Sequence, residues 1–324
     1  MTKEANRPTL KTIAQELGVT ANTVSLALKG SPRVKEDTRR RVLEVAQKQG
    51  YVRDMLASSL REGQSRTIAL IFGDIGNPLY AIRIKKLEKI FRLNGYQILI
   101  LNTNNDPKQE KEVISVVIGR KVDGVVCTPS PYGRAALDLL RSRNIPCVLV
   151  GRYFDDAYED SVVWDNEGGA RLAARYLWNK GCHQPIYIAQ ELSTISTERS
   201  RLSGFVNGLM ECGFSREEAL SRCFATDYAD PAEYVHQKVK LPYDGVFCFN
   251  DQIAWAVASC VKDNVTVIGF DNMQSVLRLP FGLPSIGADL DVEAGWVAEL
   301  LLSRIARDER PKEKRILPVC LVEH

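Results

Sequence analysis

The chain has 324 residues, of which 45% are apolar and 26% are charged, values that are typical of globular proteins. They exclude a disordered, collagen-like or coiled-coil chain. No apolar run approaches the roughly 18 residues that a membrane span needs. The polar start Met1–Arg7 lacks the apolar core of a secretory signal, so we expect a cytoplasmic protein.

The charge is unevenly distributed. Residues 1–66 carry 13 lysines and arginines against 7 acidic residues, a net charge of +6. The other 258 residues carry 30 against 33, a net charge of −3. A basic head before a slightly acidic body favours an anionic partner at the N-terminus, with nucleic acid as the first candidate.

Two short helices are predicted in the basic head. Thr9 and Thr20 can each cap one of them, over 9–17 and 20–28, where apolar residues recur at helical spacing. Gly18 breaks the first helix. Two short helices joined by a glycine-containing turn are typical of a helix-turn-helix.

A third helix is predicted over 35–49. Arg39, Arg40 and Arg41 are consecutive on it, so they cannot all share one face. At least one should be free to contact a phosphate. The alternative is that these arginines only solvate the helix surface.

This head resembles the N-terminus of the LacI/GalR family of transcription regulators, on residues 9–30 and then on Val34, Thr38-Arg39, Val42 and Gly50-Tyr51. In that family the second helix lies in the major groove, and its first residues read the edges of the bases. The matching positions are Ala21, Asn22 and, one turn later, Leu26.

The resemblance implies a role for each of these positions. Asn22 can form paired hydrogen bonds with adenine, and Ala21 offers only a methyl group. Leu26 stands where members often have arginine and cannot pair with guanine, so no member's operator sequence is transferred. Phosphate contacts are expected from Thr12, Thr20, Thr23, Ser25 and Lys29.

A hinge is predicted over 53–66. Asp54 can cap a helix that is too short to be stable alone. In the family this helix forms on DNA, and a leucine wedges into the minor groove; Leu60 stands at that position. Arg53 can replace an arginine contact that is missing at Ser58. The alternative is that Leu60 is a linker residue packed on the body.

Strands and helices alternate from residue 67 on, which predicts parallel sheets covered by helices. The expected strands are 68–72, 97–101, 124–128, 147–150, 186–189, 245–249 and 265–270. The expected helices are 81–94, 109–119, 134–143, 168–180, 201–212 and 253–261. Two such rounds of about 100 residues predict two similar lobes.

This body resembles the family's effector-binding core, which is related to periplasmic sugar-binding proteins. We therefore expect three domains: a helix-turn-helix domain over 1–52, the hinge over 53–66 and a core over 67–324. Crossings near Val163, Asp289 and Leu317 would give an N-lobe of 67–162 and 290–316 and a C-lobe of 163–289 and 317–324. Ligands of such folds bind between the lobes, at the carboxyl ends of the strands.

Polar and aromatic residues suited to a polyol follow the predicted strands. The candidate effector-binding residues are Asp74, Tyr80, Arg152, Arg201, Tyr228, Asn250 and Asp271. The resemblance implies effector contacts for Arg201, Asn250 and Asp271. The alternatives are helix capping by Asp74, Asn77 or Asp251, and a surface position for Tyr228. For Asp165 and Asn166 capping is preferred to ligand contact.

The eight cysteines include no CxxC pair, which argues against a zinc site or a disulfide framework. Reduced thiols that pack as small apolar residues are expected. No metal and no cofactor are predicted.

Two functions other than transcription regulation are disfavoured by the sequence. An enzyme is disfavoured because the chain has no GxGxxG, GxxxxGK[ST] or GxSxG motif and only three histidines. A free-standing sugar-binding protein is disfavoured by the DNA-binding head.

The sequence therefore predicts a repressor that binds a pseudo-palindromic operator as a homodimer. Its affinity would be controlled by a small effector, with a sugar first and a nucleobase next. Too few cationic groups are available for a sugar phosphate, which favours a neutral sugar. Whether the effector induces or corepresses stays open.

Overall fold

The computed structural model describes residues 8–51, 64–156, 158–190, 195–226, 231–277 and 282–323. The chain divides into two compact units, one that ends at Ser65 and one that begins at Arg66. Of the predicted site residues, Arg53, Leu60 and Tyr228 lie outside the described residues.

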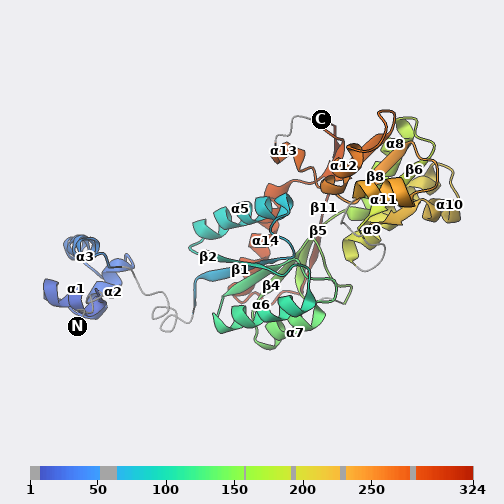
Figure 1. The fold of residues 1–324 in the computed structure, drawn as a ribbon. Helices are drawn as coiled ribbons and strands as arrows, with labels where there is room; N and C mark the ends of the chain where they lie inside the picture. The colour runs from blue at the N-terminus through green and yellow to red at the C-terminus, as the bar shows by residue number, and fades with distance from the viewer. Residues whose placement is uncertain are drawn as a thin grey trace, which may run out of the picture. The chain divides into compact units, whose positions relative to one another are not determined.

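Over residues 8–51, which the structure describes, the head contains the helices α1 (Leu10–Leu17), α2 (Ala21–Leu28) and α3 (Glu36–Lys48) (Figure 1). Both predicted caps are confirmed: Thr9 Oγ1 accepts the Thr12 amide at 3.2 Å, and Thr20 Oγ1 accepts the Thr23 amide at 3.1 Å. Gly18 has a φ of 65° and turns the chain between α1 and α2.

The three head helices share one small apolar core, formed by Ile13, Ala14, Val24, Ala27, Val34, Val42 and Ala46. Leu26 is half-buried and packs against this core, whereas Asn22 on the same helix is exposed. α2 therefore has one face that stabilises the head and another that is free for contact.

The first lobe of the body is built on a parallel sheet with the strand order β11-β5-β4-β3-β1-β2. Its strands are β1 (Thr67–Phe72), β2 (Gln97–Asn102), β3 (Gly124–Cys127), β4 (Cys147–Val150), β5 (Asp160–Trp164) and β11 (Lys314–Leu317). Its helices are α5 (Pro78–Leu93), α6 (Pro107–Gly119), α7 (Arg134–Ser142) and α14 (Leu290–Ile305).

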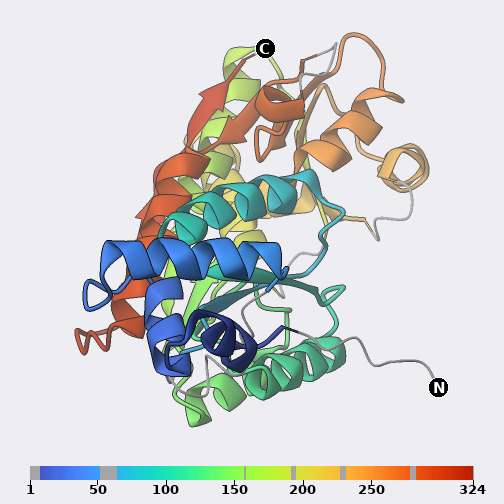
Figure 2. The same ribbon diagram turned by 90° about the vertical axis from the view of Figure 1, so that its left-hand side faces the viewer.

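Helices cover both faces of this sheet. α5 and α14 lie on one face and α6 and α7 on the other (Figures 1 and 2). Successive β1 residues accordingly enter two different apolar cores, Ile68 and Leu70 the first and Ala69 and Ile71 the second. Burial on both faces explains why the strand is a continuous apolar run.

The second lobe has a sheet with the strand order β12-β10-β9-β8-β6-β7, in which only β12 is antiparallel to its neighbour. Its strands are β6 (Pro185–Ala189), β7 (Cys223–Ala225), β8 (Gly245–Cys248), β9 (Thr266–Phe270), β10 (Ser285–Gly287) and β12 (Cys320–Val322). Its helices are α8 (Asn166–Asn179), α9 (Ser196–Glu211), α10 (Arg216–Ser221), α11 (Pro231–Lys238), α12 (Asp251–Ala258) and α13 (Gln274–Leu277).

Two helices of the second lobe approach each other very closely. A Cβ at Gly204 of α9 would lie 2.1 Å from the carbonyl oxygen of Glu167 in α8, so a larger residue would force the helices apart. Since α9 carries Arg201 toward the space between the lobes, this contact fixes the position of a predicted site residue.

The chain passes between the lobes three times: from β5 to α8, from β10 to α14 and from β11 to β12. The predicted architecture of a helical head and two parallel-sheet lobes is confirmed. In the described part of the chain, no helix combines the length and the apolar character that a membrane crossing requires.

The ends of several helices differ from the prediction. α5 begins at Pro78, three residues early, because Asn77 caps it and proline fits the first turn. α9 begins at Ser196 instead of 201, and its N-cap Ile195 offers no side-chain signal. Additional short elements, such as β7 and α10, lack a clear apolar period.

Candidate functional site

The space between the two lobes is lined by side chains that follow the carboxyl ends of strands in both sheets. This cleft holds about 940 Å³ of empty space, open solvent included. Its walls come from the segments after β1, β2, β3 and β4 in the first lobe, and after β6, β8 and β9 in the second. A cleft at strand ends where the strand order reverses is the expected ligand site of such sheets.

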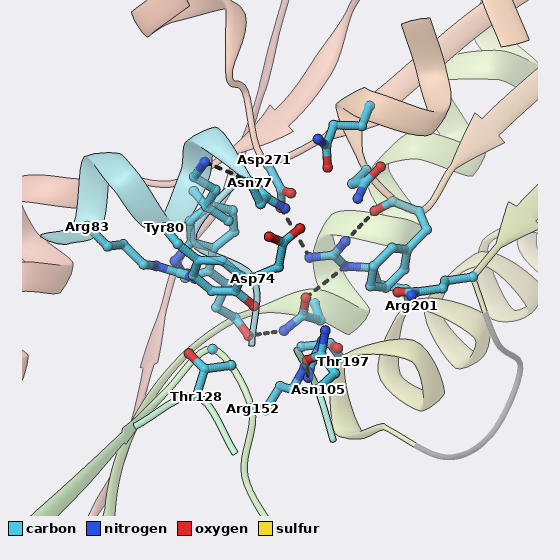
Figure 3. A pocket seen from close by; sticks show the side chains of 18 residues that line it. Asp74, Asn77, Tyr80, Arg83, Asn105, Thr128, Arg152, Thr197, Arg201 and Asp271 are labelled. Atoms are coloured by element: carbon cyan, nitrogen blue, oxygen red, sulfur yellow. Dashed lines mark hydrogen bonds and ion pairs between the residues drawn. The ribbon is translucent and has the colours of Figure 1, made fainter. Parts of the chain in front are cut away.

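The structure brings six of the predicted effector residues together in this cleft: Asp74, Tyr80, Arg152, Arg201, Asn250 and Asp271. In Figure 3, Tyr80 and Arg83 lie on one side and Arg201 on the other. The lining residues that the sequence analysis did not assign to the effector are Asn77, Leu79, Arg83, Asn105, Thr128, Gly151, Trp164, Asn166, Gln190, Thr197, Phe249 and Gln252.

Arg201 is buried in the second lobe, and each of the three nitrogen atoms of its guanidinium contacts an acceptor. Its Nε donates to Asn166 Oδ1 at 2.9 Å, Nη1 donates to the carbonyl oxygen of Phe249, and Nη2 lies 3.5 Å from Asp271 Oδ1. The guanidinium also stacks on the Phe270 ring, 3.6 Å from its centroid. Arginine suits this place because its planar fork can satisfy several acceptors at once.

Two carboxyl groups near Arg201 are buried. Burial raises the pKa of Asp271, against the opposing effect of Arg201. Burial first, and the nearby Asp271 carboxylate second, raise the pKa of Asp251 to about 7. Asp251 does not line the cleft but accepts the Met273 amide at 2.6 Å and the Ser285 hydroxyl at 2.6 Å.

These contacts show that Asp251 holds a turn in place and does not cap a helix. The alternative that Asp251 caps the next helix is wrong, because Asn250 is the N-cap of α12 and its Oδ1 accepts the Ile253 amide at 2.9 Å. Asp251 instead fixes the turn that follows β9. That turn contains Asp271, which has a φ of 100°.

Of the other residues considered as helix caps, two cap a helix and two do not. Asn77 caps α5, accepting the Leu79 amide at 2.9 Å, and Asp165 caps α8, accepting the Gly168 amide at 2.9 Å. Asp74 caps no helix; it accepts the Gly76 amide at 2.9 Å and stays exposed. Asn166 is buried and serves Arg201 rather than a helix end.

The floor of the cleft contains a buried group that the sequence analysis missed. Arg83 of α5 donates twice to Glu293 of α14, at 2.7 and 2.9 Å, and the Trp164 indole donates to Glu293 at 2.6 Å. The Trp164 ring in turn stacks on Phe270 of the second lobe, with centroids 6.0 Å apart. No local pattern in the sequence signals a pair of residues so far apart in the chain.

Arg152 enters the cleft from the turn after β4. Gly151 has a φ of 77°, a left-handed conformation that favours glycine in this turn. Arg152 Nη1 donates to Asn105 Oδ1 at 2.7 Å and to the Pro129 carbonyl at 3.4 Å. Both acceptors are neutral.

The candidate DNA-contacting residues of the described head differ in their hydrogen bonds and in their exposure. Thr12 and Thr20 are engaged in helix capping, and the Thr20 and Thr23 hydroxyls lie 2.9 Å apart. Asn22 and Lys29 are exposed, while Ala21, Ser25 and Leu26 are half-buried.

The three consecutive arginines of α3 differ in their contacts. Arg39 donates to the Ser31 carbonyl at 2.9 Å, and Arg40 pairs with Asp37 at 2.6 Å. Arg41 is exposed and makes no ion pair within the described residues, so it is the arginine best placed for a phosphate.

The cysteines are all free thiols: Cys127, Cys147, Cys182 and Cys248 are buried, and Cys320 is exposed. Across the described ranges, no three His, Cys, Asp or Glu side chains form a group that could hold a metal ion.

Family models match both parts of the chain. Residues 9–54 match the bacterial regulatory proteins of the lacI family. Residues 65–280 match the periplasmic binding proteins and sugar binding domain of the LacI family.

Individual proteins show the same similarity. The HTH-type transcriptional regulator DegA of Bacillus subtilis (strain 168) is 29% identical, covering 98% of this chain and 97% of DegA. The lac repressor dimer bound to operator and the anti-inducer ONPF has a TM-score of 0.81 at 19% identity, with 98% of each chain covered. A LacI family regulator from Enterococcus faecalis V583 with bound ribose has a TM-score of 0.69 at 25% identity, covering 79% of this chain and 97% of that one.

The second family model alone spans more than half of the chain, and the first accounts for its head. The chain therefore belongs to the LacI family of bacterial transcription regulators.

Proposed function

We propose that this regulator is a sequence-specific repressor whose operator affinity is set by a sugar bound between the two lobes. The observation that carries the proposal is the presence, on one chain, of a helix-turn-helix with an exposed Asn22 and of a polar cleft at strand ends. The head alone would suit a DNA-binding protein without an effector, and the cleft alone would suit a free-standing sugar-binding protein. Their presence on one chain suits a regulator whose DNA binding depends on a ligand.

Each part of the chain is assigned one role in this proposal. Residues 1–52 contact the operator, residues 53–66 form the hinge, and residues 67–324 bind the effector and a second copy of the chain. Two heads related by two-fold symmetry match a pseudo-palindromic site. The operator-bound lac repressor, a structural neighbour of this chain, is likewise a dimer.

The effector side chains are assigned by the donors and acceptors that face the cleft. Arg201 and Asp271 in the second lobe, with Asp74 and Arg152 in the first, bind from opposite walls, and Tyr80 supplies an aromatic face. A ligand held by both lobes favours one lobe arrangement over the other. A coupling of about 1–3 kcal/mol would change operator affinity roughly 5- to 150-fold.

Selection of binding sites from a random duplex library, without added ligand, tests the DNA-binding half of this proposal. Recovery of one symmetric site is the expected result. A parallel selection with Asn22→Ala should lose the preference at one position of each half-site. If no shared sequence emerges, the selection is repeated with pooled sugars, and a second failure contradicts sequence-specific binding.

A further inference from the structure

The cationic groups of the cleft are not equivalent in how their charge is balanced. Arg83 is neutralised by Glu293 at 2.7 Å, and Arg201 faces Asp271 at 3.5 Å. Arg152 makes no ion pair with any described carboxylate. It is the one arginine of the described cleft lining whose charge has no direct partner.

The guanidinium of Arg152 also has unused donors. Both of its hydrogen bonds, to Asn105 and to the Pro129 carbonyl, are made by Nη1. Nε and Nη2 donate to no described residue, and neither is sealed from solvent. The edge that remains is the side of the fork that binds a carboxylate with two parallel hydrogen bonds.

Glu110 is a carboxylate that Arg152 influences electrostatically, and it is already hydrogen-bonded elsewhere. The buried carboxylate of Glu110 accepts the Ser130 amide at 3.0 Å and the Ser130 hydroxyl at 2.5 Å. Burial raises the pKa of Glu110, although Arg152 acts in the opposite direction. The carboxylate of Glu110 is thus held by Ser130 and leaves the fork of Arg152 open.

Arg152 stands where two cavities meet. Besides the cleft, it lines a second cavity with about 580 Å³ of empty space, open solvent included. That cavity is bounded by Tyr153 and Phe154 from the first lobe and by Ser196 from the second. Two carboxylates also line it, but both face other arginines: Asp155 pairs with Arg199 at 2.8 Å, and Asp156 lies 4.0 Å from Arg134. An acidic end of a ligand would therefore meet Arg152 at the edge of the cleft.

We propose that the effector is a polyhydroxy acid with a single negative charge, whose carboxylate is bound by Arg152 while its hydroxyl groups face the polar walls of the cleft. The inference rests on the proposed effector function of this cleft. A phosphate ester carries about −1.5 to −2 charges at neutral pH. One open cation, with the exposed Asp74 carboxylate in the same lining, suits a carboxylate better than a phosphate.

Calorimetric titration of the full-length protein with matched ligands tests this inference. The probes are gluconate, glucuronate, galacturonate and ribonate, each beside its neutral aldose, with glucose 6-phosphate and ribose 5-phosphate. We expect at least one acid to bind, and its neutral counterpart to bind at least about tenfold more weakly.

Variants of Arg152 separate charge from geometry. Arg152→Gln should weaken binding of the acid at least about tenfold, and Arg152→Lys should give an intermediate loss because it keeps the charge without the fork. Arg143→Gln is the matched control, since it removes the same charge from an exposed position on the same lobe and should leave the affinity within twofold. Thermal unfolding of each variant verifies that it is folded.

The outcomes distinguish this inference from the proposed function. If neutral sugars bind as tightly as the acids, or a sugar phosphate binds best, the acid is wrong and the sugar effector stands. If an acid binds equally well to Arg152→Gln, the assigned residue is wrong. If no probe binds, both the acid and the sugar effector are contradicted.

Discussion

Arg83 and Glu293 form a two-pronged ion pair that is almost completely buried, with side-chain exposures of 6% and 2%. It joins α5 to α14 beneath the cleft, and the Trp164 indole completes it. Burial acts to lower the pKa of Arg83, but the charge and hydrogen bonds of Glu293, with help from other nearby groups, act against it, and the pKa is raised. The pair is thus stable as a unit and costly to divide.

Removing one partner of this pair should be strongly destabilising. Glu293→Gln keeps an acceptor for Trp164 but leaves the Arg83 charge buried and uncompensated. We expect the free energy of unfolding to fall by about 3–5 kcal/mol, as for other divided buried pairs. Urea unfolding, with the midpoint and slope both fitted, measures the change.

Glu299→Gln on the same helix is the matched control. Glu299 also accepts two hydrogen bonds from an arginine, Arg315, at 2.9 and 3.0 Å, but its side chain is 59% exposed. Its loss should cost less than about 1 kcal/mol. Replacing Arg83 and Glu293 together by Met and Leu should recover part of the stability, less the cost of leaving the buried Trp164 indole without an acceptor. An equal loss of unfolding free energy in Glu293→Gln and Glu299→Gln would contradict the claim that burial makes the Arg83–Glu293 pair costly to divide.

The buried Asp251 should make stability depend on pH. Its pKa rises from 3.8 to about 7 on folding, so its contribution is complete below 3.8 and is lost as the pH rises through about 7. Asp251→Asn cannot ionise, yet its amide can serve the Met273 amide and the Ser285 hydroxyl. We expect wild type to lose stability relative to this variant as the pH rises from about 4 to about 7, measured by urea unfolding.

Asp263→Asn supplies the control for this comparison, because Asp263 is exposed in the same lobe. Its difference from wild type should stay constant over the same pH range. A constant difference for Asp251→Asn as well would mean that Asp251 is ionised throughout.

The sequence predicted the cleft best where polar residues directly follow apolar strands. Asp74, Arg152 and Asp271 stand at such places, and strand ends meet at one edge of a parallel sheet. Their location therefore follows from local patterns and topology. The strand order and the pairing of the two lobes place them in one cleft.

The rest depended on contacts between distant segments. Arg83 lies among other charged residues of α5 and resembles a solvated helix position, because its partner Glu293 is 210 residues away. Asn166 resembled a helix cap, and only the approach of α9 to α8 turns it toward Arg201. The sequence also could not tell which of the adjacent residues Asn250 and Asp251 caps α12, because both side chains suit a cap. Asp251 is bound by Ser285 of β10, and Asn250 is the cap.

Arg201 should couple the effector to the rest of the second lobe. Arg201→Lys keeps a charge for Asp271 but loses the fork that holds Asn166 and the Phe249 carbonyl. We expect at least about a tenfold loss of affinity for a ligand identified by calorimetry, with affinity for the selected operator within twofold of wild type. Fluorescence anisotropy measures the operator affinity. Equal loss of both activities would show that Arg201 is structural.

Asn22 and Arg41 should affect DNA binding in different ways. Asn22→Ala removes paired hydrogen bonds to adenine and should cost about 1–3 kcal/mol of discrimination at one base pair, sparing other positions.

Arg41→Gln should weaken binding to all sequences and reduce the salt slope by about 1, because a phosphate contact carries no sequence information. Anisotropy titrations over several salt concentrations measure both effects, with Arg143→Gln on the body as control. A changed sequence preference in Arg41→Gln, or a uniform loss in Asn22→Ala, would reverse the assignment of α2 to the bases and α3 to the backbone.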